Sequence, residues 1–282
     1  MKLETVPCYL CSEPAADPWA TENGFHMVKC RGCGLVYLNP RPTLDEIDEA
    51  AKTGMHRFTS GALNAISAFS KRKVADYQAK LQQLIPAADL NKPLRWLDIG
   101  AGFGELVKAV QQLAATGSYA RGIEPCAPKV KKAQALGLPI DAAQLSELNE
   151  RFTHLSLINV YSHLPDPVAF ISDLKCHLEP RGSLVVVTGN GGDVPRAEFP
   201  GALYVPDHLS FAGEENVKTV LQRAGFEICA VNRYTDAPSL ARLPITFLKN
   251  IARRLTGRPS VPLFLPKGSR FRSLWIHARL AA

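Results

Sequence analysis

The sequence predicts an α/β fold whose main part is a mostly parallel β-sheet covered by helices on both faces. From Leu94 onward, short apolar segments alternate with segments of helical length and pattern, as in a parallel sheet with helical crossovers. The first apolar segment runs into a glycine-rich turn, the place where open α/β sheets bind ligands. A third observation sets the first 42 residues apart, because they hold two close cysteine pairs and no long periodic pattern.

Composition and motif order divide the chain into three predicted parts. Residues 1–42 form a small Cys- and turn-rich unit, residues 43–90 a helical linker or lid, and residues 91–282 the α/β domain with an insertion near 238–266. A chain of 282 residues with 46% hydrophobic residues is long enough for one large core and a small appended unit.

The linker is predicted to be helical in two pieces, broken near Gly54 and Gly61. Thr43 and Glu46 have the spacing of a capping box at the start of the first piece. The second piece, residues 62–84, has apolar residues near helical spacing.

The α/β part contains seven predicted strands and four predicted helices. The strands are Leu94–Ile99, Ala120–Ile123, Leu138–Asp141, Leu155–Val160, Ser183–Thr188, Glu227–Asn232 and Ser273–Arg279. The helices are Glu105–Ala114, Pro128–Leu136, Pro167–His177 and Glu214–Ala224.

The glycine-rich turn reads "LDIGAGFGE", with Gly100, Gly102 and Gly104 after Asp98. Glycines let the backbone approach a ligand, and the helix start offers free N–H groups. The spacing is one residue tighter than the G-x-G-x-x-G of dinucleotide-binding proteins. Glu124 ends the next predicted strand, where an acid can hold two ribose hydroxyls. The combination indicates a nucleotide-type cofactor, and a dinucleotide or a cofactor-free scaffold is the alternative.

The N-terminal cysteine pairs have metal-site spacing. "CYLC" and "CRGC" supply Cys8, Cys11, Cys30 and Cys33, with eighteen residues between the pairs, as in structural zinc sites. Four thiolates leave no open coordination position, so the predicted Zn²⁺ is structural. Free structural thiols are the alternative, and a redox pair would require a βαβ context.

The segments "LDIGAGFGE", "GIEP" and "NVYSHLPDPVAFISDLKCHLEPRGSLVVV" resemble the class I S-adenosylmethionine-dependent methyltransferases. "VKCRGCGLVYLNPRP" resembles the zinc ribbon fused to a subgroup of them, many of which act on sugars, lipids or natural products. The resemblance implies a Rossmann-like seven-stranded sheet whose last strand is antiparallel. It also implies cofactor-binding roles for Asp98, Gly100, Ala101, Gly102, Phe103, Gly104, Glu124, Pro125, Gln144 and Asn159. Gln144 departs from the family pattern, because it stands where an acid contacts adenine.

Two histidines are candidates for a catalytic base, because histidine titrates near neutral pH. His163 follows the fourth predicted strand, and His208 lies in "VPDHLSF", which resembles a family segment near the acceptor pocket. Helix capping or packing is the alternative for His163. Tyr161 and Tyr204 either line the pocket or pack in the core.

The net charge of +7 is concentrated at the C-terminal end. From Ala237 there is no Asp or Glu and there are nine basic residues: Arg242, Lys249, Arg253, Arg254, Arg258, Lys267, Arg270, Arg272 and Arg279. They indicate an anionic partner or a solvated face. Residues 243–258 have an apolar and a basic side, as in a lid, a membrane-surface helix or, as we prefer, a helix packed on its own domain.

No apolar segment has membrane-spanning length and the N-terminus lacks a signal core, which predicts a cytoplasmic protein. The expected function is methyl transfer from S-adenosylmethionine to a hydroxyl or carbon of a sugar-like, lipid-linked or natural-product acceptor. Two alternatives are an RNA methyltransferase that uses the zinc ribbon and basic tail, and a non-catalytic zinc-ribbon scaffold. Scarce aromatic residues among the basic ones argue against base stacking.

Overall fold

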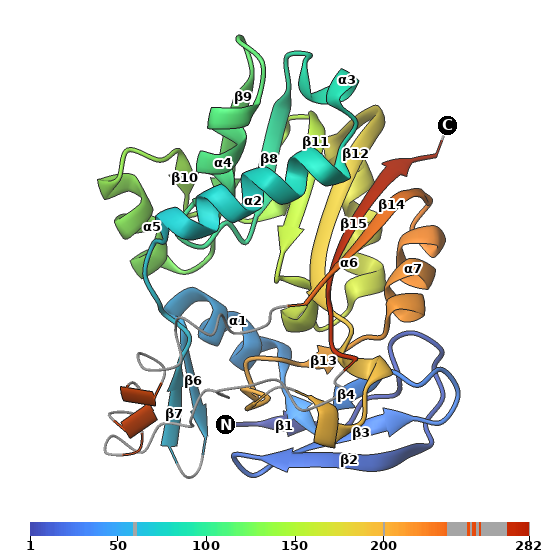
Figure 1. Ribbon diagram of the computed structural model, residues 1–282. Helices are drawn as coiled ribbons and strands as arrows, with labels where there is room; N and C mark the ends of the chain where they lie inside the picture. Colours follow the sequence, from blue (N-terminus) through green and yellow to red (C-terminus); the bar gives the residue numbers. More distant parts are fainter. Residues whose placement is uncertain are drawn as a thin grey trace.

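The computed structural model describes residues 1–58, 61–199, 201–235 and 270–281, together with 247, 248, 250, 251 and 254. Its largest element is a seven-stranded sheet (Figure 1) in the order β10-β9-β8-β11-β12-β15-β14. The strands are β8 (Arg95–Ile99), β9 (Tyr119–Ile123), β10 (Ile140–Asp141), β11 (Phe152–Ile158), β12 (Leu178–Gly189), β14 (Phe226–Tyr234) and β15 (Ser273–Leu280). Only β15 is antiparallel to its two neighbours in this sheet. The predicted Rossmann-like sheet is therefore confirmed.

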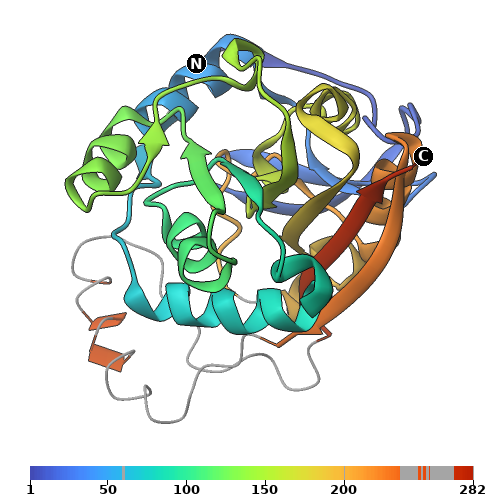
Figure 2. The same cartoon turned by 90° about the horizontal axis from the view of Figure 1, so that it is seen from above.

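Helices cover both faces of the sheet (Figure 2). The helices are α2 (Lys71–Leu84), α3 (Ala87–Leu90), α4 (Glu105–Leu113), α5 (Ala127–Ala135), α6 (Pro167–Asp173) and α7 (Glu214–Arg223). Successive residues of a strand face opposite sides, so Trp96 packs in the core under α2, α4 and α5. Leu97, the next residue, packs in the core under α6 and α7. Because both faces are covered, the inner strand β11 and the second half of β12 are buried along most of their length.

The Cys-rich unit builds a second sheet in the order β13-β4-β3-β2 (Figure 1). Its strands are β2 (Ala16–Glu22), β3 (Phe25–Cys30), β4 (Val36–Leu38) and β13 (Ser210–Phe211), and β1 (Leu3–Glu4) pairs separately with β5 (Arg41–Pro42). Strand β13 comes from the segment between β12 and α7 and pairs antiparallel with β4. Cys8, Leu10 and Tyr37 share one hydrophobic core with strand β11. The N-terminal unit is thus joined to the α/β part of the chain in two ways: strand β13 of that part completes its sheet, and the two share one hydrophobic core.

The linker is only partly helical, and the prediction of helix over residues 62–70 was wrong. Helix α1 (Leu44–Thr53) ends at Gly54, whose φ is 69°. A hairpin of β6 (Met55–Phe58) and β7 (Gly61–Asn64) follows, and α2 begins only at Lys71. The side chain of Asn64 accepts a hydrogen bond from the backbone N–H of Ile66 at 2.8 Å, a local bond that favours a turn over a helix.

The predicted capping box at Thr43 was also wrong. The side chain of Thr43 makes no capping hydrogen bond. Glu46 accepts a hydrogen bond from the backbone N–H of Lys2 at 3.0 Å instead. The start of the chain, which is distant in sequence from α1, therefore provides the donor for the Glu46 carboxylate that the local pattern assigned to the helix start.

The expected insertion near 238–266 and the amphipathic segment 243–258 lie almost wholly outside the described residues. Of the nine C-terminal basic residues, four are described. Among these, Arg270 forms an ion pair with Glu198 at 3.3 Å, and Arg279 forms one with Asp89. Within the described part of the chain, no helix is long and apolar enough to cross a membrane.

Candidate active site

The glycine-rich turn connects β8 to α4 at the carboxyl end of an inner strand. Gly100, Gly102 and Gly104 have φ values of 69°, 57° and 84°. A Cβ added to Gly100 would lie 2.5 Å from Cγ2 of Val160, so only glycine combines this conformation with this close approach. Nothing lies within 4 Å of a Cβ added to Gly102. The turn is therefore tight against the neighbouring loop at one glycine and open at the next.

Glu124 reaches the turn from the adjacent strand. It follows β9, is 4% exposed, and accepts a hydrogen bond from the backbone N–H of Gly102 at 2.8 Å through Oε2. Its Oε1 accepts from the backbone N–H of Cys126 at 3.0 Å and lies 3.8 Å from Nζ of Lys129. The predicted acid and the predicted turn are therefore in direct contact.

Asp98 is buried beneath the turn, with 2% of its surface exposed. The hydroxyl of Ser156 donates to its Oδ1 at 2.6 Å, and the indole N–H of Trp96 donates to the same hydroxyl oxygen at 2.8 Å. Burial raises the pKa of Asp98 to about 7, and the negative charges of Glu124 and Glu105 act in the same direction. The site therefore holds a carboxyl group that loses its proton at a higher pH than an ordinary aspartate does.

The other predicted cofactor residues lie around this centre. Ala101 and Phe103 alternate with the glycines and are buried. Asn159, exposed and with φ of 57°, follows β11. Pro125 and Gln144 are also exposed, and the backbone N–H of Gln144 donates to Oε2 of Glu147 at 2.9 Å. Asn159, Pro125 and Gln144 all follow the carboxyl ends of parallel strands, so they lie along one edge of the sheet.

Both predicted histidines belong to one cluster with Asp207. His163 ends the 3₁₀ helix η2 (Tyr161–His163), and its Nδ1 lies 2.8 Å from the backbone oxygen and 3.0 Å from Oδ1 of Asp207. Nδ1 of His208 lies 2.7 Å from the backbone oxygen of Leu203. The two imidazole rings have centroids 4.8 Å apart. Nε2 of His56, on β6, lies 3.0 Å from the same Oδ1.

The surroundings shift the pKa values of Asp207, His163 and His208 in different directions. Burial opposes ionisation of Asp207, but the charge and hydrogen bond of His163 and the hydrogen bond of His56 outweigh it and hold the pKa well below its ordinary value. Burial likewise lowers the pKa of His163, but the Asp207 carboxylate more than compensates and raises it. For His208, burial and then the charge of His163 lower the pKa to about 4. The structure thus places a carboxylate beside one imidazole whose protonated form it favours and a second imidazole whose neutral form is favoured.

The loop that carries Asp207 and His208 is held by the N-terminal unit. The carboxylate of Glu22 accepts hydrogen bonds from the backbone N–H groups of Leu203 and Tyr204 at 2.8 and 2.7 Å. The side-chain amide of Asn23 donates to the backbone oxygen of Val205 at 2.7 Å. The turn between β2 and β3 therefore positions the loop.

The two candidate tyrosines have different surroundings. Tyr161 is fully buried, and its hydroxyl lies 3.3 Å from the hydroxyl of Tyr9 between the first two cysteines. Tyr9 in turn lies 3.5 Å from Oγ of Ser210. The ring of Tyr204 meets His208 edge-on, with centroids 6.3 Å apart. Tyr161 thus faces the Cys-rich unit, and Tyr204 faces the histidine cluster.

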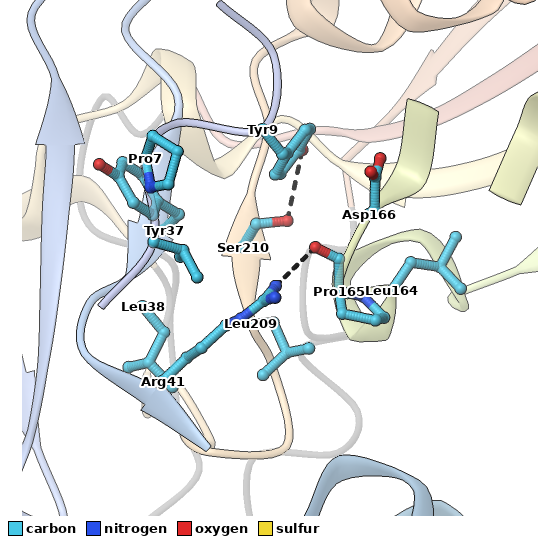
Figure 3. A pocket seen from close by; sticks show the side chains of 11 residues that line it. Pro7, Tyr9, Tyr37, Leu38, Arg41, Leu164, Pro165, Asp166, Leu209 and Ser210 are labelled. Atoms are coloured by element: carbon cyan, nitrogen blue, oxygen red, sulfur yellow. Dashed lines mark hydrogen bonds between the residues drawn. The ribbon is translucent and has the colours of Figure 1, made fainter. Parts of the chain in front are cut away.

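A cavity of about 220 Å³ lies where the Cys-rich unit meets these loops (Figure 3). Its lining includes Leu164 and Leu209, which directly follow His163 and His208 in the sequence. The guanidinium of Arg41 points into it and donates to the backbone oxygen of Pro165 at 2.6 Å. The N-terminal unit therefore contributes one wall of a cavity beside the histidine cluster.

The four predicted metal ligands converge. The Sγ atoms of Cys8 and Cys33 are 3.5 Å apart, those of Cys11 and Cys30 are 3.4 Å apart, and all four lie within 4.8 Å of one another. A tetrahedral ion with Zn–S bonds of about 2.3 Å separates its sulfur atoms by roughly 3.8 Å. A Cβ added to Gly32 would lie 3.3 Å from Sγ of Cys11, so the second knuckle passes close to the first pair. The donor set and separations fit Zn²⁺.

Sequence reasoning missed Asp207, His56 and Glu22. Asp207 directly precedes His208 in "VPDHLSF", so an acid beside a candidate base was a usable signal. His56 gave no signal, because it lies in the break between the two predicted helical pieces and has no supporting sequence context. The role of Glu22 depends on contacts across 181 residues of sequence.

Comparison with known proteins identifies the family. A family model described as a methyltransferase domain matches residues 70–231, more than half of the chain. The chain belongs to the class I S-adenosylmethionine-dependent methyltransferase family. The expectation from the sequence motifs is thereby confirmed.

One curated methyltransferase relative is the ubiquinone biosynthesis O-methyltransferase of Dinoroseobacter shibae. It is 31% identical over 151 residues, which cover 48% of this chain and 61% of the relative. The match therefore spans less than two thirds of that enzyme.

Two solved structures share the methyltransferase fold. The 1,6-didemethyltoxoflavin-N1-methyltransferase of Burkholderia thailandensis, with bound 1,6-didemethyltoxoflavin and S-adenosylhomocysteine, has a TM-score of 0.51 and 16% identity over 95% of this chain and all of the other. The [4+2]-cyclase SpnF has a TM-score of 0.52 and 17% identity over 77% and 83% of the two chains. At these identities the similarity shows a common fold alone.

Proposed function

We propose that this protein transfers a methyl group from S-adenosylmethionine to a hydroxyl or carbon of a small-molecule acceptor. The observation that supports this most directly is the contact between Glu124 and the glycine turn above the buried Asp98. It joins the two acids and the glycines of the family motif in one site.

This chain's own residues fit the cofactor. Gly100, Gly102 and Gly104 would face its methionine part, where the open space above Gly102 admits a ligand. Asp98 would hold its positive charge, and Glu124 would accept hydrogen bonds from the ribose hydroxyls. Gln144 would meet the adenine edge with its amide, and Ala101, Phe103, Pro125 and Asn159 would complete the pocket wall.

The histidine cluster would act on the acceptor. S-adenosylmethionine, when bound, supplies an electrophilic methyl group in line with the attacking atom. The attacking hydroxyl or carbon must lose a proton, and such assistance contributes about 10²–10⁴-fold to a rate. Nδ1 of both His163 and His208 is engaged by protein oxygens, so their Nε2 atoms are available to the acceptor. Asp207 orients His163.

The cofactor proposal is tested by calorimetry. We expect wild-type protein to bind S-adenosylmethionine and not NAD, and Glu124→Ala to weaken binding about 100-fold through the loss of two charge-assisted hydrogen bonds. Glu227→Ala, which removes an exposed acid on β14, is the matched control. Absence of cofactor binding by the wild type would overturn the enzyme proposal.

Cofactor affinity is expected to rise between pH 6 and pH 8. The pKa of Asp98 is raised to about 7, chiefly by burial, whereas a cationic ligand prefers the carboxylate form. Below the pKa, binding must expel a proton, which costs up to about tenfold in affinity per pH unit. By the same linkage, the contribution of Asp98 to the folding stability of the unliganded protein is largest below pH about 4. This contribution is lost as the pH rises through about 7.

Calorimetric dissociation constants at pH 6, 7 and 8 measure this effect, with Asp98→Asn beside the wild type. The variant should bind more weakly and show a flat pH profile over this range. An unchanged slope in Asp98→Asn would assign the pH dependence to another group.

The four cysteines are proposed to hold one structural Zn²⁺. A Cys₄ site has no open position for a substrate, so its part in the function is to maintain the N-terminal unit. That unit anchors the loop of Asp207 and His208 through Glu22.

RNA is the second candidate acceptor, motivated by the zinc ribbon and the basic C-terminal residues. An RNA-binding role predicts an affinity that falls steeply and linearly on logarithmic axes as salt rises. A flat salt dependence of acceptor binding would support the small-molecule proposal.

A further inference from the structure

His163, Asp207 and His208 form the second of two groups of potential metal ligands in the described part of the chain, the first being the four cysteines. One potential ligand atom from each of the three lies within 4.8 Å of the others. We propose that these three side chains bind a divalent transition-metal ion. The inference rests on the proposed methyl transfer and specifies how the acceptor is activated.

Each proposed ligand is oriented by a hydrogen bond through an atom that is not needed for the metal. Nδ1 of His163 donates to the backbone oxygen of Asp207 at 2.8 Å, and Nδ1 of His208 donates to that of Leu203 at 2.7 Å. Oδ1 of Asp207 lies 3.0 Å from Nε2 of His56. Metal-binding histidines in proteins almost always donate their second N–H to a carbonyl or carboxylate, and metal-binding carboxylates are themselves hydrogen-bonded.

The atoms left available are Nε2 of His163, Nε2 of His208 and Oδ2 of Asp207. Two imidazoles and one carboxylate are the donor set of metal sites that keep open positions. Imidazole nitrogen favours Zn²⁺, Fe²⁺ or Ni²⁺ over Mg²⁺ or Ca²⁺. Metal–ligand bonds of about 2.1 Å place two donors of one ion roughly 3.4 Å apart, so rotation of the side chains must bring these three atoms to that separation when the ion binds.

The ligands are also partly accessible. A third of the His163 side chain and 19% of the Asp207 side chain are exposed, so an ion and an acceptor oxygen can reach them. An ion held by three protein atoms retains open positions, and a bound divalent ion supplies a Lewis acid that lowers the pKa of a hydroxyl ligand. The two histidines and Asp207 would then hold the ion while the acceptor hydroxyl releases its proton to solvent water, and the resulting oxygen anion would attack the methyl group.

Metal analysis of untagged protein tests the proposal. After incubation with excess Zn²⁺ and removal of free metal, we expect about two zinc ions per chain in the wild type, one of them at the cysteines. His208→Ala and Asp207→Asn should each reduce the content to about one, because each removes one of three ligands. His26→Ala removes an exposed histidine outside the cluster and should retain two.

Cobalt distinguishes the two sites by their spectra. Co²⁺ bound to thiolates absorbs through sulfur-to-metal charge transfer, whereas a nitrogen–oxygen site lacks this absorption. With zinc retained at the cysteines, added Co²⁺ should give a spectrum without charge transfer, and His208→Ala should lose it. If the wild type retains only one zinc ion, or binds the second ion only at millimolar concentration, the site holds an adventitious ion only and the proposal is wrong.

The proposed function has a separate readout. S-adenosylmethionine calorimetry does not depend on this cluster. Cofactor binding and turnover by protein that retains a single zinc ion would therefore overturn the metal site and leave methyl transfer in place. Failure of cofactor binding with two zinc ions retained would overturn methyl transfer instead.

Discussion

His163→Ala is expected to lower kcat about 10²–10⁴-fold, the range for the loss of assistance to a proton transfer. The side chain contacts Asp207 through Nδ1 at 3.0 Å, and its Nε2 is the nitrogen left for an acceptor or a metal ion. Removing the imidazole abolishes both possible roles of His163, as a base for the acceptor and as a ligand of a metal ion. The cofactor residue Asp98 lies on β8 and Glu124 directly follows β9, whereas His163 lies on η2. The dissociation constant for S-adenosylmethionine should therefore not change.

Steady-state kinetics with an accepted substrate, beside cofactor calorimetry, measures this prediction. His26→Ala is the matched control, since it removes an exposed histidine of the N-terminal sheet. A kcat within a few-fold of wild type would show that His163 packs or caps η2 and does not assist the reaction. Partial recovery of the variant by added imidazole would support the direct role of the side chain.

Replacing both Cys8 and Cys30 by serine should remove the ribbon zinc and lower Tm by about 10 °C or more. Structural Zn²⁺ contributes roughly 10 kcal/mol or more of apparent binding free energy to the fold that creates its site, and a few degrees of Tm correspond to about 1 kcal/mol. Both cysteines are buried, and they share a hydrophobic core with strand β11 of the large sheet. The loss of stability is therefore expected to extend beyond the N-terminal unit into the large sheet.

Thermal unfolding and metal analysis of the double variant measure this effect. Cys176→Ser with Cys229→Ser is the control, because both residues are exposed and lie outside the cluster. A zinc-free variant with an unchanged Tm would contradict a structural role of the metal. Acceptor turnover should fall more than cofactor affinity, since the ribbon unit holds the Asp207 loop through Glu22.

The strands and the cofactor turn could be predicted because their signals are local. A strand buried on both faces is a short apolar segment, and a turn that must approach a ligand requires glycine wherever φ is positive. All seven predicted strands occur in the sheet, with ends shifted by a few residues. The neighbouring strand then brings Glu124 to Gly102, because adjacent parallel strands end at the same edge.

The linker could not be predicted in the same way. Its apolar residues have helical spacing from residue 62 onward, but the side chains of Asn64 and Ser70 accept backbone hydrogen bonds that start a turn and a new helix. Pairing of β6 with β7 then satisfies the backbone groups of that segment. The two short strands stabilise each other by pairing, and the residue periodicity of a single short segment does not reveal such pairing.

The sequence by itself determined the α/β class, the glycine turn with its two acids, and the cysteine set, because each depends on residue type at fixed spacing. Only the tertiary structure decided that Asp207 joins His163, that His56 reaches the same carboxylate, and that the Cys-rich unit shares strand β13 with the loop beside them. Those contacts join segments 44 to more than 150 residues apart. They form because one hydrophobic core buries residues of the N-terminal sheet together with residues of the loop that carries Asp207, and Phe58 of β6 packs against the same core. Such burial is set by the packed molecule as a whole.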